Sequence, residues 1–189
     1  MTVRANINET EGQFYITFTC YRWLSLFEAT NGYDIVYKQF DILKSEGHSI
    51  LGYVIMPNHV HFIVYFSDGI GNINKRIGTM KRFMAYEIVK RLKDAGKTIL
   101  LSQLELGVTN ADKKKGKLHE VFEPSFDIKQ CLNNSFTEQK LDYIHNNPCR
   151  GKWNLSSIPE EYLHSSASFY ILDSPGIYAV THYLDIKQG

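Results

Sequence analysis

Two histidines, His59 and His61, stand one residue apart in an otherwise apolar stretch from Val54 to Val64. Side chains alternate between the two faces of a β-strand, so both imidazoles would point to one side while Val60 points into the core. Two imidazoles a few ångströms apart suit chelation of one divalent cation. The alternative is an ordinary pair of half-buried histidines, so the metal site needs a partner group.

A candidate partner lies further along the chain. Apolar spacing predicts a helix over 137–146 with Thr137 as its N-cap, and Pro148 ends this helix near Asn147. Tyr143 and Asn147 are four residues apart and would project from one helix face. That face would offer a phenol and an amide oxygen. The alternative is a core tyrosine beside a polar helix end.

Together the two segments resemble the single-tyrosine HUH transposases, of the insertion-sequence-200 type or associated with repetitive extragenic palindromes (REP). The family's first hallmark is a strand with a His-hydrophobic-His motif, here His59-Val60-His61 after Met56-Pro57-Asn58. Its second is a helix that carries the nucleophilic tyrosine, here Tyr143 in Tyr-Ile-His-Asn-Asn-Pro. The similarity extends from about Phe14 to about Tyr170 and includes a Ser165-Ser166 pair.

This resemblance implies cleavage and rejoining of single-stranded or hairpin DNA, as in DNA transposition and recombination. Tyr143 would form a 5′-phosphotyrosine and free a 3′-hydroxyl. A second 3′-hydroxyl would then rejoin the strands without ATP, because the phosphotyrosine conserves the phosphoester energy. In the insertion-sequence branch the third metal ligand is usually a glutamine four residues after the tyrosine. Asn147 occupies that place here, as in the palindrome-associated branch.

The chemistry of a tyrosine nucleophile explains why a metal would be needed. A phenol has a pKa of about 10 and is mostly protonated at neutral pH. A divalent cation held by His59 and His61 would polarise a non-bridging oxygen of the scissile phosphate. Asn147 would complete the ligand set or orient metal-bound water, and such mixed ligation suits Mg²⁺ or Mn²⁺.

The elements that must position these groups follow from the periodicity of apolar residues. The order is βαββαβ followed by the tyrosine helix, which predicts an α+β fold of the ferredoxin-like, split βαβ type. An antiparallel sheet would carry helices on one face, and the family resemblance implies the same fold. The predicted elements are strand 13–21, helix 33–45, strands 50–56 and 59–66, helix 72–94, and an irregular or edge strand around 121–128.

The net charge of +1 conceals a strong segregation of charge. Residues 75–117 contain twelve Lys or Arg and four acidic residues, whereas residues 153–189 contain one Lys and four acidic residues. Such segregation is typical of a nucleic-acid groove, although a solvated basic helix would produce the same pattern. The candidate DNA contacts are Lys75, Arg76, Lys81 and Arg82 in the long helix, and Arg150 and Lys152 after the tyrosine helix.

Length and composition set the remaining expectations. A chain of 189 residues with 43% hydrophobic residues fits one catalytic domain over 1–189, with a flexible insertion at 97–119 and an irregular extension at 153–189. Three widely spaced cysteines favour a reducing compartment and argue against a thiolate zinc site. No signal peptide or membrane-spanning run is visible, so a cytoplasmic protein without membrane contact is expected.

Two other functions compete with the transposase interpretation. One is a domesticated hairpin-DNA-binding protein that kept the fold and lost transposition. The other is a metal-dependent hydrolase of small phosphoesters, with water as nucleophile in place of Tyr143. The oligomeric state is also open, because insertion-sequence relatives form homodimers that exchange the tyrosine helix while palindrome-associated relatives act as monomers.

Overall fold

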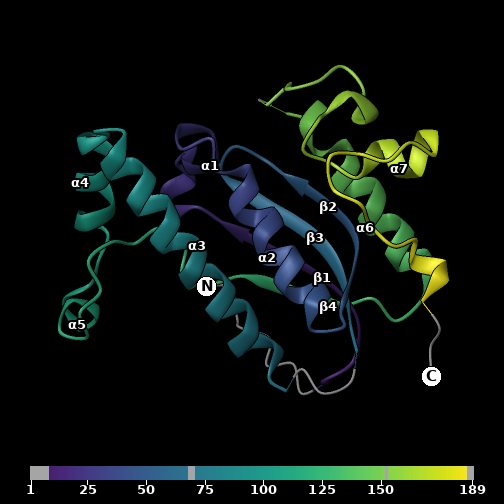
Figure 1. The fold of residues 1–189 in the computed structure, drawn as a ribbon, viewed down its shortest axis with the longest axis horizontal. Helices are drawn as coiled ribbons and strands as arrows, with labels where there is room; N and C mark the ends of the chain where they lie inside the picture. Colours follow the sequence, from purple (N-terminus) through teal and green to yellow (C-terminus); the bar gives the residue numbers. More distant parts are fainter. Residues whose placement is uncertain (1–8, 68–70, 152, 187–189) are drawn as a thin grey trace.

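A four-stranded sheet forms the centre of the computed structural model, which describes residues 9–67, 71–151 and 153–186 (Figure 1). Its neighbouring strands are all antiparallel, in the order β2-β3-β1-β4. Helix α2 (Tyr33–Ser45) connects β1 to β2, and α3 (Ile73–Asp94) lies between β3 and β4. This is the expected ferredoxin-like arrangement. The strands are β1 (Gly12–Thr19), β2 (Ser49–Ile55), β3 (His59–Phe66) and β4 (Asp127–Gln130).

The two faces of the sheet are covered by different helices. On the face under α2 and α3, here called the apolar face, side chains such as Phe18 and Phe62 are almost completely buried against Phe40 of α2. Helix α6 (Asn134–Asn146) packs on the opposite face, here called the cleft face, where Leu141 and Ile144 join a smaller apolar cluster. The strand alternation around His59 and His61 therefore separates two environments, as the sequence predicts.

Beyond this framework the described residues form short helices. The expected flexible insertion, 97–119, contains α4 (Thr98–Leu106) and α5 (Asn110–Lys113), and Leu104 of α4 is fully buried. The others are α1 (Leu26–Ala29), α7 (Ala167–Leu172) and the single 3-10 turns η1 (Tyr21–Trp23), η2 (Asn147–Cys149), η3 (Pro159–Glu161) and η4 (Tyr183–Asp185). Within the described ranges, every helix is too short or too polar to span a membrane.

The Ser165-Ser166 pair covers the outer edge of β2. The backbone N–H of Ser166 donates to the carbonyl of Tyr53 at 3.0 Å, and Val54 and Ser165 form an antiparallel bridge. The Ser166 hydroxyl accepts from the N–H of Tyr53 and lies 2.9 Å from Nε2 of His145 on α6. One serine thus fastens the tyrosine helix to the sheet of its own chain.

Gly52 allows α6 to approach the sheet closely. The β2–β3 register shifts between Ile50 and Gly52, as at a β-bulge. A Cβ atom at Gly52 would lie 2.5 Å from Cδ2 of Leu141, so a larger residue would force the Leu141 side chain or α6 to move. Glycine at this position is therefore part of what seats α6.

Three predicted boundaries are wrong for local reasons. Helix α6 starts at Asn134, because Oδ1 of Asn133 caps it by accepting the N–H of Phe136, whereas Thr137 lies inside the first turn. The fourth strand starts only at Asp127, since Pro124 cannot donate to a strand neighbour. The first strand ends at Thr19, before the 3-10 turn η1.

Candidate active site

A cleft of about 580 Å³ lies between the sheet and the C-terminal end of α6. The β1–β3 register pairs Thr17 with His61 and Thr19 with His59, so these four side chains share the cleft face. Helix α6 and the turn after it form the other wall. The lining residues are Tyr15, Thr17, Thr19, Trp23, His59, His61, Asp127, Lys129, Lys140, Tyr143, Asn147, Arg150, Gly151 and Trp153.

Asn58 fixes the tautomer of His59. The Asn58 side chain is fully buried in the β2–β3 turn, and its Nδ2 donates to the carbonyl of Trp23 at 2.8 Å. Its Oδ1 therefore faces Nδ1 of His59, 2.7 Å away, and must accept a proton from it. The ring proton is thus held on Nδ1. The lone pair of Nε2 is left free and faces the cleft.

Two acceptor atoms then face each other across the cleft. Nε2 of His59 lies 3.2 Å from Oδ1 of Asn147, the first residue of η2 directly after α6. Neither atom carries a proton when Nδ1 of His59 does. Two lone pairs at this separation are the arrangement that a bound cation satisfies, with the imidazole and the amide oxygen as ligands.

Tyr15 orients the second imidazole. Its hydroxyl lies 2.8 Å from Nδ1 of His61, and its ring stacks on the imidazole with centroids 5.8 Å apart. Both side chains are buried, so no solvent competes for this contact. A second group that holds one ring nitrogen leaves the other, Nε2, for metal ligation, as is usual for ligating histidines.

Tyr143 reaches the same place from α6. Its ring centroid lies 5.4 Å from that of His61 and 6.5 Å from that of Tyr15. The side chain is 43% exposed, so the phenol is accessible and is not a core residue. Tyr143 and Asn147 both line the cleft, which agrees with the predicted common face of the helix.

Burial keeps both imidazoles neutral. It lowers the pKa of His59 to about 4, against the opposing effect of the contact with Asn147. Burial also lowers the pKa of His61 well below its usual value, and the nearby His59 and Lys140 lower it further. A neutral imidazole is the form that binds metal ions.

The three candidate ligands of a hard divalent cation carry no charge of their own. Among the described residues no group of three or more His, Cys, Asp or Glu side chains could hold a metal ion. The set of His59, His61 and Asn147 has two imidazoles and a neutral amide, so water or a substrate phosphate would supply the remaining ligands of Mg²⁺ or Mn²⁺. These residues therefore fit a Mg²⁺ or Mn²⁺ ion whose coordination the substrate helps to complete.

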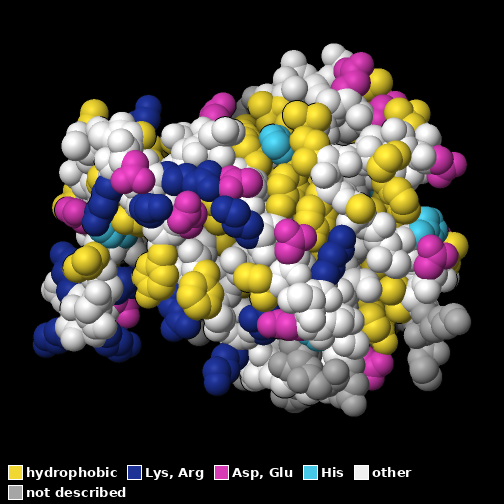
Figure 2. Space-filling model, in the orientation of Figure 1, with side chains coloured by type: hydrophobic (Ala, Val, Ile, Leu, Met, Phe, Trp, Pro, Cys, Tyr) yellow, Lys and Arg dark blue, Asp and Glu magenta, His cyan; other side chains and the backbone are white. Residues whose placement is uncertain are grey.

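The basic residues of α3 do not line this cleft. Helix α3 packs on the apolar face, and Figure 2 shows the Lys and Arg side chains gathered over α3, α4 and α5. Lys75 and Arg82 are exposed there, while Arg76 is paired with Glu46. Their contact with DNA stays a prediction, and it would require DNA that extends around the sheet.

Lys81 corrects the expected set of DNA contacts. It is 9% exposed, and its ammonium donates to the carbonyls of Glu123 and Ser125 at 2.8 and 3.4 Å. A buried cation committed to backbone carbonyls is a structural group, because releasing it would leave those acceptors unsatisfied. Of the two contacts predicted after α6, Arg150 lines the cleft, and Lys152 lies outside the described residues.

Several cleft residues were not predicted from sequence. Tyr15 and Lys129 face the cleft because β1 pairs with both β3 and β4, a register that single-strand alternation does not reveal. Lys140 precedes Tyr143 by one helical turn, and this spacing could have identified it. Trp23 and Trp153 flank His59 with ring centroids 5.5 and 6.1 Å away, and no local pattern marks them.

The chain shares its fold with a solved tyrosine transposase. A REP-associated tyrosine transposase, solved bound to a REP hairpin, aligns over 100% of this chain and 98% of its own, with a TM-score of 0.64 and 15% identity. A Deinococcus radiodurans protein assigned as a transposase aligns over 77% of this chain and 96% of its own, with a TM-score of 0.45 and 16% identity. No protein-family model matches the sequence, and no curated protein matches it.

Proposed function

We propose that this protein belongs to the single-tyrosine HUH transposases and cleaves and rejoins single-stranded or hairpin DNA through a 5′-phosphotyrosine on Tyr143. The observation that carries the proposal is convergence. Tyr143 from α6 and the His59–His61 pair from β3 lie in one solvent-open cleft, with the Tyr143 and His61 rings 5.4 Å apart. The shared fold with a hairpin-bound tyrosine transposase supports the same conclusion.

The chain's own groups would perform the reaction as an in-line displacement. The Tyr143 oxygen attacks phosphorus, loses its proton, and forms the phosphotyrosine while the bond to the 3′-oxygen breaks and that oxygen leaves as a hydroxyl. Lys140, one turn before Tyr143, would neutralise charge that develops on the phosphate. A Mg²⁺ or Mn²⁺ ion bound by His59, His61 and Asn147 would polarise a non-bridging oxygen of the same phosphate.

Substrate binding would depend on the cations of the cleft. Lys129, Lys140 and Arg150 are partly or fully exposed on its walls, and Arg150 is only loosely paired with Asp142 at 3.8 Å. Phosphate contacts of this kind release counterions, so we expect affinity for DNA to fall steeply with salt. A single strand fits better than a duplex, because Tyr143 must approach the phosphate in line.

A cleavage assay tests the proposal. Wild-type protein is incubated with Mn²⁺ and a pool of labelled hairpin oligonucleotides with single-stranded flanks, and adducts are resolved by denaturing electrophoresis and mass spectrometry. We expect a covalent adduct on Tyr143 that disappears in Tyr143→Phe and on chelation with EDTA. The exposed Tyr86→Phe on α3 is the matched control and should form adduct normally.

The same assay separates the competing functions. Hairpin binding without any adduct would favour a DNA-binding module that has lost transposition. Phosphoester hydrolysis that survives Tyr143→Phe would favour a hydrolase with water as nucleophile. An adduct on a residue other than Tyr143 would overturn the proposed chemistry.

A further inference from the structure

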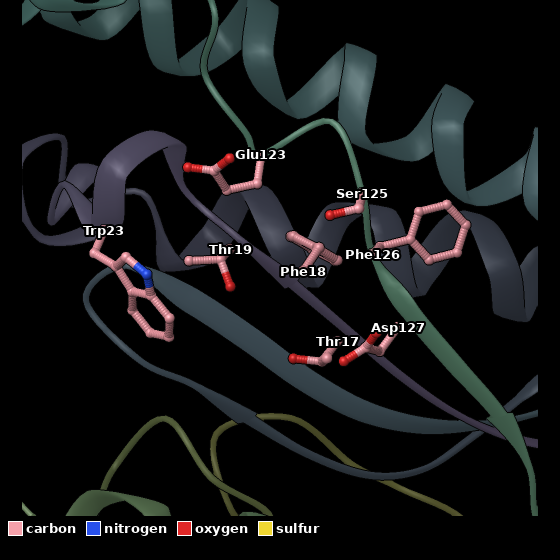
Figure 3. Close-up of a pocket in the computed structure, with 8 residues that line it drawn as sticks. All are labelled: Thr17, Phe18, Thr19, Trp23, Glu123, Ser125, Phe126 and Asp127. Atoms are coloured by element: carbon pink, nitrogen blue, oxygen red, sulfur yellow. The ribbon is translucent and has the colours of Figure 1, made fainter. Parts of the chain in front are cut away.

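A second, smaller cavity of about 170 Å³ opens where β1, the turn after it and the start of β4 meet (Figure 3). Four of its residues also line the cleft that holds His59 and Tyr143, so the two cavities adjoin. A strand held in the cleft could therefore place one group in this cavity, here called the Trp23 pocket. Its lining residues are Thr17, Phe18, Thr19, Trp23, Glu123, Ser125, Phe126 and Asp127.

Trp23 forms an exposed aromatic wall of the pocket, on a backbone held by two hydrogen bonds. Its side chain is 56% exposed, and the backbone is left-handed at both Arg22 (φ 51°) and Trp23 (φ 59°). Residues with a Cβ adopt this conformation only where the surroundings enforce it. Asn58 enforces it by donating to the Trp23 carbonyl, and Glu123 by accepting the N–H of Arg22 at 2.8 Å.

The position of this indole is tied to the catalytic centre. Asn58, which holds the Trp23 carbonyl, also fixes the tautomer of His59. The Trp23 ring contacts the His59 ring at an edge, with centroids 5.5 Å apart. A ligand stacked on Trp23 would therefore lie directly beside the groups that act on the phosphate.

The opposite wall is held by the buried Lys81. Its ammonium bonds the carbonyls of Glu123 and Ser125 and lies 5.5 Å from the centre of the Phe126 ring. This anchoring fixes the irregular segment before β4, from which Glu123 and Ser125 extend toward the pocket in Figure 3. Both walls are thus built in advance of ligand binding.

The polar groups of the pocket are mainly hydrogen-bond acceptors. Asp127 is an exposed carboxylate, and Glu123 has a second carboxylate oxygen beyond the one that accepts from Arg22. The Thr17 hydroxyl donates to the carbonyl of Val60 at 3.1 Å, so its lone pairs remain available. Two carboxylates repel a phosphate, whereas a flat group that carries N–H donors satisfies both the acceptors and the indole face.

We infer that the Trp23 pocket binds one unpaired nucleobase of the DNA strand, stacked on Trp23 and read by Asp127. The inference rests on the proposed function, because it takes the strand in the cleft to be DNA. Guanine presents a ring N–H beside its amino group and can donate two parallel hydrogen bonds to one carboxylate, whereas adenine and cytosine present only an amino group and thymine only a ring N–H. The pocket therefore prefers guanine, the one base that can donate two bonds to Asp127, over bases such as thymine that can donate one.

Trp23 itself can report binding. The chain has two tryptophans, so Trp153→Phe leaves Trp23 as the single indole, and Tyr143→Phe prevents cleavage. This double variant is titrated with a short oligothymidine that carries one central guanine, and with oligothymidine alone. We expect guanine to quench Trp23 fluorescence and to tighten binding by about five-fold or more. Anisotropy of the labelled oligonucleotides with Tyr143→Phe alone gives the same comparison without Trp153→Phe.

Asp127→Asn tests the reading group. It replaces a pure acceptor by an amide that also donates, so the preference for guanine should fall to about two-fold or less. Asp94→Asn, at an exposed position near the end of α3, removes the same charge and should keep the preference. Equal affinity for the two oligonucleotides, an unquenched Trp23, or the same preference in both variants would each overturn the inference.

These titrations need neither metal nor cleavage, which separates them from the test of the proposed function. A guanine preference in a protein that forms no adduct would leave the pocket in place and overturn the transposase chemistry. Adducts on Tyr143 without any guanine preference would overturn the pocket alone.

Discussion

On the apolar face of the sheet, Val60, Phe62 and Val64 of β3 are fully buried against α2 and α3, whereas the alternating residues His59 and His61 face the cleft. Successive residues of β3 thus face two different environments, and a shift of one residue in register would exchange them. The apolar face buries enough side chains to hold the fold. The cleft face can therefore keep imidazoles, hydroxyls and charges whose burial costs free energy.

The largest effect should come from the apolar face. Phe62→Ala removes a fully buried ring in contact with Phe18 and Phe40, and should lower the free energy of unfolding by about 3–5 kcal/mol. Urea denaturation measures the change. The neighbouring His61→Ala should cost much less stability yet prevent adduct formation. Equal losses of stability in the two variants would remove the distinction between the faces.

His145 provides a pH-dependent test of the cleft face. Burial lowers its pKa to about 4, so the unfolded chain binds a proton more readily than the folded protein. The free energy of unfolding that depends on neutral His145 is fully present above the unfolded-state pKa of about 6.5. As pH falls toward 4, up to about 3 kcal/mol of it is lost. His145→Gln keeps a donor for Ser166 and should flatten this part of the stability profile. An unchanged profile would contradict the assignment.

Tyr15→Phe tests whether the cleft face tunes the metal site. The variant removes only the hydroxyl that holds Nδ1 of His61 and should weaken Mn²⁺ binding by about 10–100-fold. Isothermal titration calorimetry measures the affinity without any cleavage step. Tyr65→Phe on β3 is the control. It removes an exposed hydroxyl that donates to Glu11, and the variant should bind Mn²⁺ normally.

Gly52→Ala should produce a modest loss of stability and a selective effect on the site. The new methyl group meets Cδ2 of Leu141, so the Leu141 side chain or α6 must shift, at a cost of about 1–3 kcal/mol. Adduct formation should slow because Tyr143 moves with the helix. The double variant Gly52→Ala, Leu141→Ala should recover part of that rate, and purely additive effects in the cycle would argue against this contact.

Much of the framework could be predicted because local patterns determine it. Helix α2 and strand β3 have the predicted bounds, since apolar residues repeat cleanly at helical and strand spacing. The convergence of Tyr143 with the His59–His61 pair was implied by the family resemblance, and the cleft brings these groups together. The catalytic roles of these residues stay proposals.

The missed features depend on contacts between distant segments. Lys81 has the sequence context of a surface lysine, and only the segment before β4 makes it an internal anchor. Asn58 looks like an ordinary turn residue until its amide is found between Trp23 and His59. Such roles arise from tertiary neighbours that no local pattern encodes.

The contact between His145 and Ser166 also affects when the cleft is fully assembled during synthesis. The segment that closes the edge of β2 is translated after Tyr143, the His59–His61 pair and the whole sheet. A nascent chain would therefore expose an open strand edge and a loosely seated α6 until Ser166 leaves the ribosome. The proposed strand cutting would thus be withheld until the segment around Ser166 has been translated and has folded onto β2.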